Sequence, residues 1–183
     1  MTEHRVILIA GVSGSGKTTI GTLLAERLGW DYAEADAFHS QANIDKMSSG
    51  HALTDADRLP WLRSIAAWID DRLRTDRPGV VTCSALKRRY RDILAGGRPE
   101  VAMVMLDGDR DTIAARLRAR KGHFFSADLL DTQFADLELP DPDEDVFTTP
   151  IDGTPEEAVA HIIAALGLAP AGADRGEADQ SSQ

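Results

Sequence analysis

The sequence predicts an α/β domain built on a mainly parallel sheet, and three observations support this fold class. Short apolar runs that resemble buried strands alternate with segments of helical periodicity, as in parallel sheets covered on both faces. A glycine-rich loop stands between the first such strand and the first helix. The length of 183 residues suits one domain with a single core of ordinary size.

The chain begins with a strand and an amphipathic helix. The strand is "RVILIA" (5–10), a nearly continuous apolar and β-branched run typical of a central strand. The helix is "TTIGTLLAERLG", which ends at Gly29, and its apolar side chains fall at helical spacing: Ile20, Leu23, Leu24 and Leu28. A second strand is expected in "GWDYA", and it ends near Glu34 and Asp36.

A long helix and two further strands are expected in the middle of the chain. The helix is "DADRLPWLRSIAAWIDDRLRT" (55–75), whose apolar face holds Trp61, Ile65, Trp68, Ile69 and Leu73. "GVVTCSA" and "VAMVML" are predicted to be buried strands, and each precedes a polar, arginine-rich helical segment.

The last expected elements are a weak strand over 146–151 and a helix in "GTPEEAVAHIIAALG". Thr154 as N-cap, Pro155 at the first position and Glu157 at the third predict a capping box. From about Ala169 onward there is no large apolar residue, so we expect one domain over 1–168 and a disordered tail over 169–183. The acidic stretch "ELPDPDEDV" predicts no role.

Composition excludes several functions. The formal charge is −10 with a pI near 4.9, which disfavours binding to nucleic acids or to anionic membranes. The single cysteine, Cys83, rules out an internal disulfide, and we expect it to be a small buried apolar side chain. The apolar run near the N-terminus is too short for a signal peptide or a membrane span, so we expect a cytoplasmic protein.

The glycine-rich loop matches G-x-x-x-x-G-K-[ST] in full and predicts binding of a nucleoside triphosphate. Glycines let successive backbone N–H groups point at phosphate oxygens, and the helix that follows adds a partial positive charge. Lys17 is expected to reach the β- and γ-phosphates, and the Thr18 hydroxyl to coordinate Mg²⁺. The predicted phosphate-binding residues are Gly11, Val12, Ser13, Gly14, Ser15, Gly16, Lys17, Thr18 and Thr19.

Such a loop alone leaves several enzyme classes open. The chain lacks the N/T-K-x-D motif by which GTPases read guanine, and a motor would need a longer chain. A short connection to a second acidic cluster favours a small-molecule kinase. A regulatory module that binds ATP without an acceptor remains the alternative from another class.

The acceptor is expected beside Glu34 and Asp36, because ligands of open α/β sheets bind at the carboxyl ends of strands. The period of two along a strand predicts that both acids face the same side. Asp36 would accept a hydrogen bond from the attacking hydroxyl, and Glu34 would order a water on Mg²⁺. The alternative is a solvated pair of loop acids.

Two cationic segments complete the predicted site. "RLRARKGHFF" concentrates five potential cations, and we expect a mobile lid over about 116–126 that brings a guanidinium to the γ-phosphate: Arg116, Arg118, Arg120, Lys121 and His123. "CSALKRRYRD" would meet an anionic acceptor through Ser84, Lys87, Arg88 and Arg91. For Arg58, His39 and Gln133, a ligand contact and an ordinary surface or packing role both stay open.

These stretches together resemble the ATP-dependent gluconate kinases (gluconokinases), in the shikimate-kinase and nucleoside-monophosphate-kinase branch of P-loop folds. The phosphate loop is shared by many families, whereas "EADAFHSQANIDKMSSGHALTDADRLPWL", "CSALKRRYRD" and "RKGHFF" are far more specific. The resemblance covers about residues 6–166. It implies a five-stranded parallel sheet flanked by helices, transfer of the γ-phosphate of ATP to the 6-hydroxyl of D-gluconate with Mg²⁺, and a homodimer.

The resemblance also assigns roles to residues of this chain. Catalysis would fall to Lys17, Asp36 and Arg120, with Arg116 beside Arg120 on ATP. Glu34 stands where relatives commonly have Asp, and it would act on Mg²⁺ through water, beside Thr18. The expected substrate-binding residues are Asp36, His39, Arg58, Ser84, Lys87, Arg91 and Gln133. A kinase for shikimate or another small acid is the alternative within enzymes.

Overall fold

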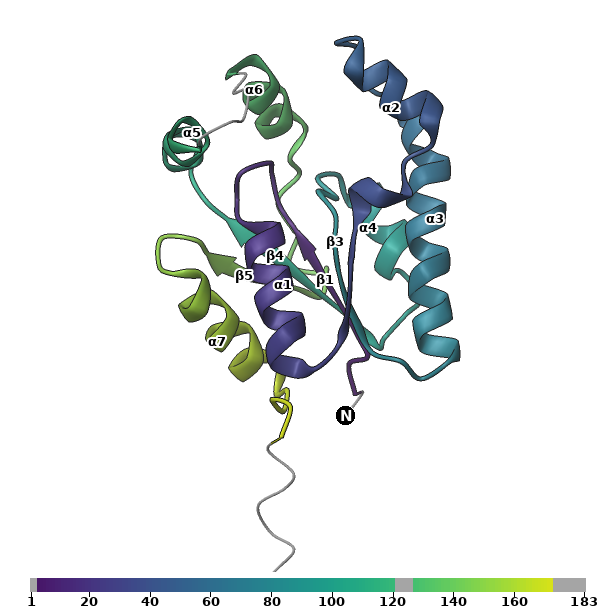
Figure 1. Cartoon of the computed structure of the whole chain (residues 1–183), viewed down its shortest axis with the longest axis vertical. Helices are drawn as coiled ribbons and strands as arrows, with labels where there is room; N and C mark the ends of the chain where they lie inside the picture. Colours follow the sequence, from purple (N-terminus) through teal and green to yellow (C-terminus); the bar gives the residue numbers. More distant parts are fainter. Residues whose placement is uncertain (1–2, 121–126, 173–183) are drawn as a thin grey trace, which may run out of the picture.

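The computed structural model describes residues 3–120 and 127–172, and within them the chain forms a five-stranded parallel sheet covered on both faces by helices (Figure 1). The strands lie in the order β2-β3-β1-β4-β5. Their bounds are β1 Val6–Ala10, β2 Asp31–Glu34, β3 Gly79–Thr82, β4 Val101–Asp107 and β5 Val146–Pro150. The predicted fold class is confirmed.

The central strand β1 is the most enclosed part of the sheet. It pairs with β3 on one side and with β4 on the other, and all five of its residues are fully buried. Side chains alternate along it, so that Ile7 and Ile9 enter one core while Val6 and Leu8 enter the other. A strand that is buried on both faces needs apolar side chains at every position, which explains the continuous apolar run in the sequence.

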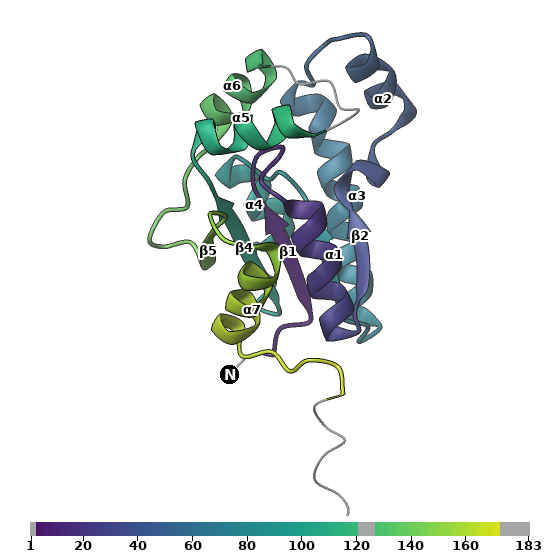
Figure 2. The same cartoon turned by 60° about the vertical axis from the view of Figure 1, so that its left-hand side comes forward.

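Helices α1 (Lys17–Leu28) and α7 (Pro155–Leu166) cover one face of the sheet, as Figure 2 shows from a second side. The helical spacing predicted for α1 is confirmed, because Ile20, Leu24 and Leu28 are buried against that face. Thr154 caps α7 by accepting from the Glu157 N–H at 3.2 Å.

Helices α3 (Asp55–Arg74) and α4 (Arg88–Ala95) cover the opposite face. On α3 the predicted apolar stripe is buried at Trp61, Ile65 and Ile69. A full capping box starts this helix, since Thr54 and Asp57 each accept from the other's backbone N–H.

Four shorter elements surround the carboxyl end of the sheet, and Figures 1 and 2 agree on their arrangement. Helices α5 (Arg110–Ala119) and α6 (Ala127–Asp136) lie on one side of this end. The 3₁₀ turn η1 (Ala35–Phe38) and helix α2 (Gln41–Ser48) lie on the other. The sequence prediction missed α2, which has Ser40 as its N-cap.

The prediction that Glu34 and Asp36 share one face of a strand is wrong. Strand β2 ends at Glu34, and Asp36 lies in the 3₁₀ turn that follows. The backbone turns there because the indole Nε1 of Trp61 donates to the Ala35 carbonyl at 2.7 Å. The period of two therefore does not apply to this pair.

The described chain continues past the expected domain end at 168. The Ala171 N–H donates to the Arg27 carbonyl at 2.8 Å, which ties the start of the expected tail to the end of α1. Residues 173–183 lie outside the described residues, and so do 121–126 of the expected lid. None of the described helices is both long and apolar enough to cross a bilayer.

Candidate active site

The phosphate loop joins β1 to α1 at the carboxyl end of the sheet, and two of its glycines are required by the backbone. Gly14 and Gly16 have φ of 79° and 100°, in the left-handed region that disfavours other residues. A Cβ on Gly14 would also lie 2.7 Å from Cγ of Leu117, so the loop tip packs directly against α5. These constraints fix the shape of the loop.

The N-terminus of α1 opens into this loop without a side-chain cap. Its N-cap is Gly16, which as a glycine offers no side chain to the first-turn N–H groups. Among the residues that the structure describes, none accepts from the N–H of Gly14 or Gly16 either. Unpaired N–H groups at a helix N-terminus form a site for anions such as phosphate.

Lys17, the first residue of α1, points its ammonium group at the loop itself. Its Nζ donates to the carbonyls of Gly11 and Val12 at 2.9 and 3.0 Å. Burial lowers the pKa of Lys17 to about 8, although Cys83, Asp36 and Glu34 act in the opposite direction. The cost of burying this cation would be offset by a bound polyphosphate.

Thr18, Glu34 and Tyr32 form a hydrogen-bonded group beside the loop. Oε1 of Glu34 accepts from the Thr18 hydroxyl at 2.5 Å and from the Tyr32 hydroxyl at 2.9 Å. These bonds, that from Thr18 first, lower the pKa of Glu34. Burial, followed by the bond to Glu34, raises the pKa of Tyr32 to about 12.

This group has the chemistry that Mg²⁺ prefers. Because the Thr18 hydroxyl donates to Glu34, the lone pairs of its oxygen remain available to a cation. Glu34 stays ionised and adds a carboxylate, and Mg²⁺ prefers such hard oxygen ligands together with water and phosphate. The side chains present therefore fit a magnesium site with Thr18 as a direct ligand and Glu34 acting through water.

Asp36 stands between the loop and the expected acceptor side. Its negative charge acts to raise the pKa of both Lys17 and His39, against the larger lowering by burial, so the carboxylate lies within electrostatic range of both side chains. Within the described part of the chain the carboxylate is exposed and accepts no hydrogen bond. It is thus free to accept one from a bound hydroxyl.

His39 is held flat against the long helix. Its ring stacks on Trp61 with the centroids 4.3 Å apart and the planes 9° from parallel. Nδ1 of His39 lies 3.4 Å from the Asn43 amide, which in turn donates to the Asp57 carbonyl at 3.0 Å. Burial lowers the pKa of His39, so the ring is a neutral hydrogen-bonding group at ordinary pH.

Arg58 and Lys87, which lie 29 positions apart in the chain, meet on Tyr90 and Asp55. Nη1 of Arg58 donates to the Tyr90 hydroxyl at 3.2 Å, and Nζ of Lys87 lies 3.7 Å from Oδ1 of Asp55. Both cations also lie over the Tyr90 ring, at 5.9 and 5.8 Å from its centroid. Arg89 pairs with Asp55 as well. The predicted cations of the acceptor side are therefore brought together around one carboxylate.

Arg91 does not join that group. Its side chain is 2% exposed, and its Nε and Nη2 donate to the two carboxylate oxygens of Glu144, each at 2.8 Å. Nη1 donates to the carbonyls of Ala85 and Leu86 at 3.3 and 3.1 Å. Because the whole guanidinium is used in the interior, we remove Arg91 from the set of substrate-binding residues. Arg88 likewise pairs outward, with Asp141 and Asp143.

The remaining predicted residues lie close to the loop. The Ser84 carbonyl accepts from the Gly11 N–H at 3.2 Å, and Gln133 bonds to Ser13. Arg116 on α5 donates to the Ile151 carbonyl, and Arg120 is the exposed residue that ends α5. Lys121 and His123 lie outside the described residues. Cys83 is 1% exposed and burial raises its pKa to about 12, as expected of a buried apolar thiol.

Sequence reasoning missed four side chains of this region: Tyr32, Asp55, Trp61 as a stacking partner, and Tyr90. Of these, only Tyr32 could have been predicted from the sequence. It lies two positions before Glu34 on the same strand and therefore on the same face. The others depend on contacts between residues 22 to 35 positions apart.

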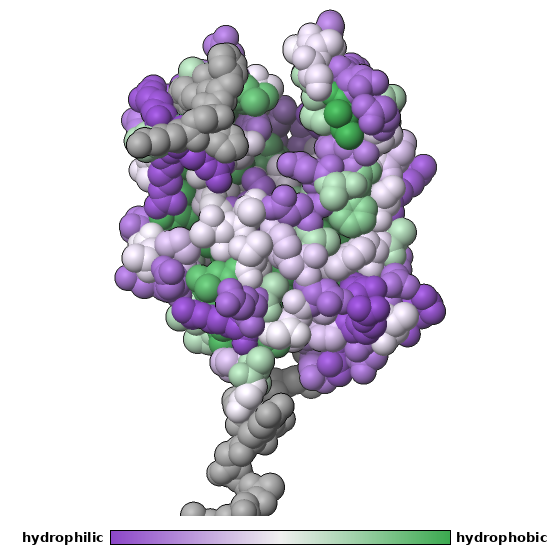
Figure 3. Space-filling model, in the orientation of Figure 1, coloured by the Kyte–Doolittle hydropathy of each residue, from purple (hydrophilic) through white to green (hydrophobic). Residues whose placement is uncertain are grey.

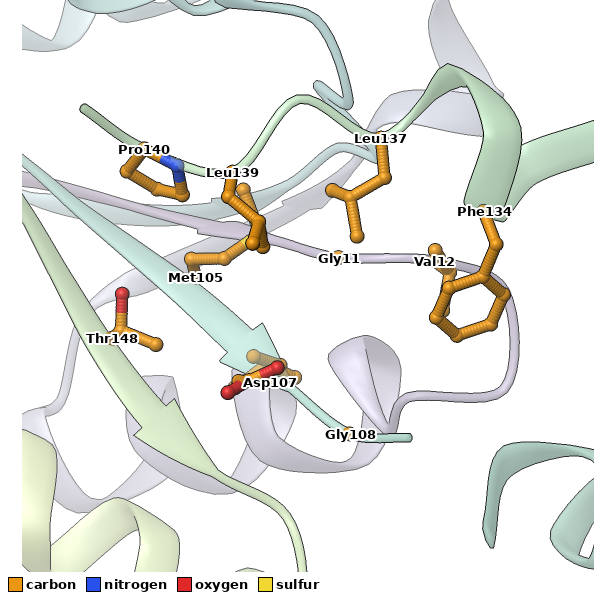
Figure 4. Close-up of a pocket in the computed structure, with 11 residues that line it drawn as sticks. Gly11, Val12, Met105, Asp107, Gly108, Phe134, Leu137, Leu139, Pro140 and Thr148 are labelled. Atoms are coloured by element: carbon orange, nitrogen blue, oxygen red, sulfur yellow. The ribbon is translucent and has the colours of Figure 1, made fainter. Parts of the chain in front are cut away.

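A separate cavity of about 240 Å³ lies behind the start of the loop (Figure 4). Gly11 and Val12 border it, and it extends between β4, β5 and the segment 134–140. Its walls are mainly apolar, from Met105, Phe134 and Leu137. None of the charged side chains described above lines it.

The fold and the loop together define a kinase of the P-loop class. A family model described as an AAA domain matches residues 6–140. The chain is 43% identical to a gluconokinase of Gluconobacter oxydans (strain 621H) over 171 residues, covering 89% of this chain and 96% of that protein. It is 42% identical to the thermoresistant gluconokinase of Escherichia coli (strain K12), over 88% and 93% of the two chains.

A solved structure agrees with these relatives. The crystal structure of a gluconokinase from Sinorhizobium meliloti 1021 is 41% identical and superposes with a TM-score of 0.79, over 91% of this chain and 94% of that one. The chain belongs to the gluconokinase family, and the resemblance drawn from its motifs is confirmed.

Proposed function

We propose that this chain transfers the γ-phosphate of ATP to the 6-hydroxyl of D-gluconate, giving 6-phospho-D-gluconate and ADP. Besides membership of the family, the position of Asp36 supports this proposal. The Asp36 carboxylate, which has no protein partner among the described residues, acts electrostatically both on Lys17 of the phosphate loop and on His39 of the opposite side. A hydroxyl placed there would stand between a bound triphosphate and the acceptor-side cations.

The triphosphate would be held by the loop and the open N-terminus of α1. The unpaired N–H groups of Gly14 and Gly16 would donate to phosphate oxygens. Lys17 would leave the carbonyls of Gly11 and Val12 for the β- and γ-phosphates. Arg116 and Arg120, at the end of α5, would supply further positive charge to the transferring group.

Thr18 and Glu34 would hold Mg²⁺, Thr18 directly and Glu34 through a water. The ion, when bound, neutralises negative charge on the phosphate oxygens. The side chains present keep the Thr18 oxygen oriented, because Glu34 accepts a hydrogen bond from the Thr18 hydroxyl and is itself held by a hydrogen bond from Tyr32.

Asp36 would accept a hydrogen bond from the 6-hydroxyl and orient its oxygen toward the γ-phosphorus. Phosphoryl transfer passes through a loose transition state, so orientation matters as much as proton removal. The proton would pass to Asp36 as the new P–O bond forms and the bond to ADP breaks. His39, stacked on Trp61, would hydrogen-bond another hydroxyl of the chain-like acceptor.

Arg58 and Lys87 would bind the carboxylate of gluconate. In this structure both already lie near a carboxylate, that of Asp55, at 3.8 and 3.7 Å. Two cations converging on one anion suit an acidic polyol better than a neutral sugar. Ser84, half-buried and three positions before Lys87 in the chain, is a further proposed contact.

A coupled assay of ADP release tests the proposal. With ATP and Mg²⁺ fixed, D-gluconate, D-glucose, shikimate and other sugar acids are offered in turn. We expect turnover with gluconate far above the rate with water, and none with glucose. Turnover with another acid but not with gluconate would overturn the substrate assignment. ATP binding without any acceptor-dependent ADP release would instead support a regulatory module.

A further inference from the structure

The phosphate loop is tied to helix α6 by one glutamine. Oε1 of Gln133 accepts from the backbone N–H of Ser13 at 2.7 Å, and its Nε2 donates to the Ser13 hydroxyl at 2.9 Å. The two residues are 120 positions apart. Both ends of the side-chain amide are thus used on a single loop residue.

The next loop residue is fixed from the neighbouring helix. Gly14 packs against Leu117 of α5 so closely that a Cβ would lie 2.7 and 2.8 Å from two of its side-chain carbons. Ser13 is therefore held by hydrogen bonds with α6, and Gly14 is held by packing against α5. The rest of the loop closes on itself, since the Ser15 N–H and hydroxyl both bond to the Val12 carbonyl.

The hydrogen bond to Gln133 occupies one backbone N–H of the loop and leaves others free to bind a ligand. The Ser13 N–H is engaged by the glutamine, whereas no described residue accepts from those of Gly14 and Gly16. The bond from the Ser13 N–H holds the plane of the Val12–Ser13 peptide unit, and the close contact with Leu117 restrains Gly14, a residue with intrinsic freedom. Preorganised donors bind an anion more tightly because less ordering is required on binding.

We propose that Gln133 is a positioning residue for ATP, acting through Ser13 to hold the phosphate loop in its binding conformation. This departs from the expectation that Gln133 binds the acceptor. Its oxygen and one of its two amide hydrogens are already satisfied by the loop, which leaves little to offer a sugar acid. The proposal depends on the proposed use of ATP but not on the identity of the acceptor.

The test measures binding of Mg·ATP in the absence of any acceptor, by titration calorimetry. Gln133→Met keeps the shape of the side chain and removes both hydrogen bonds, and we expect the Kd of Mg·ATP to rise about tenfold. The KM for gluconate should stay within about twofold at saturating ATP, because no hydrogen bond to the acceptor is lost. An unchanged Kd for Mg·ATP with a raised KM for gluconate would overturn the proposal and return Gln133 to the acceptor site.

A double-mutant cycle shows whether the effect passes through Ser13. Ser13→Ala removes only the hydroxyl, one of the two partners, and should raise the Kd about threefold. If Gln133 acts through Ser13, the double variant should resemble Gln133→Met alone, at about tenfold, rather than the product of about thirtyfold. A multiplicative result would contradict the mechanism. Since Ser13→Ala leaves α6 intact, it tests the bond even if Gln133→Met folds poorly.

Thr132→Ala is the matched control on the same helix. Its hydroxyl donates to the Asp128 carbonyl within α6, and it makes no hydrogen bond to the described residues of the loop. We expect an unchanged Kd for Mg·ATP. A rise equal to that of Gln133→Met would mean that α6 stability in general, and not the bond to Ser13, sets the affinity, and the proposal would fail.

Discussion

Asp36 owes its proposed role to what surrounds it rather than to its residue type. Exposed acids are common among the described residues, and Figure 3 shows hydrophilic residues spread widely over one face of the molecule. Asp36 differs because its field reaches both Lys17 and His39 and because no described residue donates to its carboxylate. An acid that a neighbour already holds could not serve an incoming hydroxyl.

Replacing Asp36 tests that role. We expect Asp36→Asn to lower kcat by about 10²–10⁴-fold, the usual effect of losing a general base, while the Kd of Mg·ATP changes little. Steady-state kinetics and calorimetry on the same preparation separate the two quantities. Asp45→Asn, on the exposed side of α2, is the control and should keep full turnover. Wild-type turnover in the Asp36 variant would show that the acceptor binds elsewhere.

Glu34 makes a different prediction, because it is bonded to the proposed metal ligand Thr18. In Glu34→Gln the amide oxygen can still accept from Thr18, but the negative charge is lost. The Mg²⁺ concentration for half-maximal activity should therefore rise about tenfold, as for other groups that orient metal ligands.

Binding of ATP without Mg²⁺ provides the second readout for Glu34. It should be equal or tighter in the Glu34→Gln variant, since one negative charge near the phosphates is gone. Glu26→Gln, exposed further along α1, is the matched control. An unaltered magnesium requirement in the Glu34 variant would remove that residue from the metal site.

At the scale of elements, the loop after β3 depends on a buried ion pair from a distant segment. Arg91 of α4 pairs with Glu144, whose side chain is 6% exposed, and holds the carbonyls of Ala85 and Leu86. Ala85 has φ of 41°, which is unfavourable for a residue with a Cβ. The pair thus supports the strained turn that carries Ser84 and Lys87 to the site.

Breaking this pair should destabilise the whole fold. Glu144→Gln leaves the buried Arg91 without its counter-charge, and we expect the free energy of unfolding to fall by about 3 kcal/mol. Urea unfolding followed by circular dichroism measures the change. Asp143→Asn removes an exposed partner of Arg88 and should cost less than about 1 kcal/mol. Equal stabilities of the two variants would contradict a structural role for the Arg91–Glu144 pair.

Elements whose signals are local could be predicted from the sequence. Strand β1, the glycine loop and α1 follow from short-range periodicity and from the glycine pattern, and all three are confirmed. The turn at Asp36 could not be predicted, because it depends on Trp61 donating to Ala35 from 26 positions away. Arg91 was misassigned for the same reason, since Glu144 lies 53 positions later in a stretch that predicted no role.

Across the whole molecule, the sheet order brings the parts of the site that follow strands to one end. The loop follows the central strand β1, Glu34 ends the edge strand β2, and Ser84 follows β3 between them. Parallel strands bring these ends together, so residues distant in the chain converge there. Because the chain as a whole has a formal charge of −10, anionic ligands must be attracted by the local cations of the site.

The homodimer implied by the family resemblance stays a prediction. Light scattering after size-exclusion chromatography should give about twice the chain mass of 19.8 kDa. A mass equal to one chain across the concentration range used for assays would exclude a dimer as the active form.

Phosphorus NMR of the product tests most directly which hydroxyl of D-gluconate receives the phosphate. The 6-hydroxyl is the primary alcohol of D-gluconate, so a phosphate on it couples to two protons. After reaction with ATP, Mg²⁺ and gluconate, we expect a phosphomonoester signal split into a triplet, in equal amount to the ADP formed. A doublet, from phosphate on a secondary hydroxyl, or inorganic phosphate alone would contradict it.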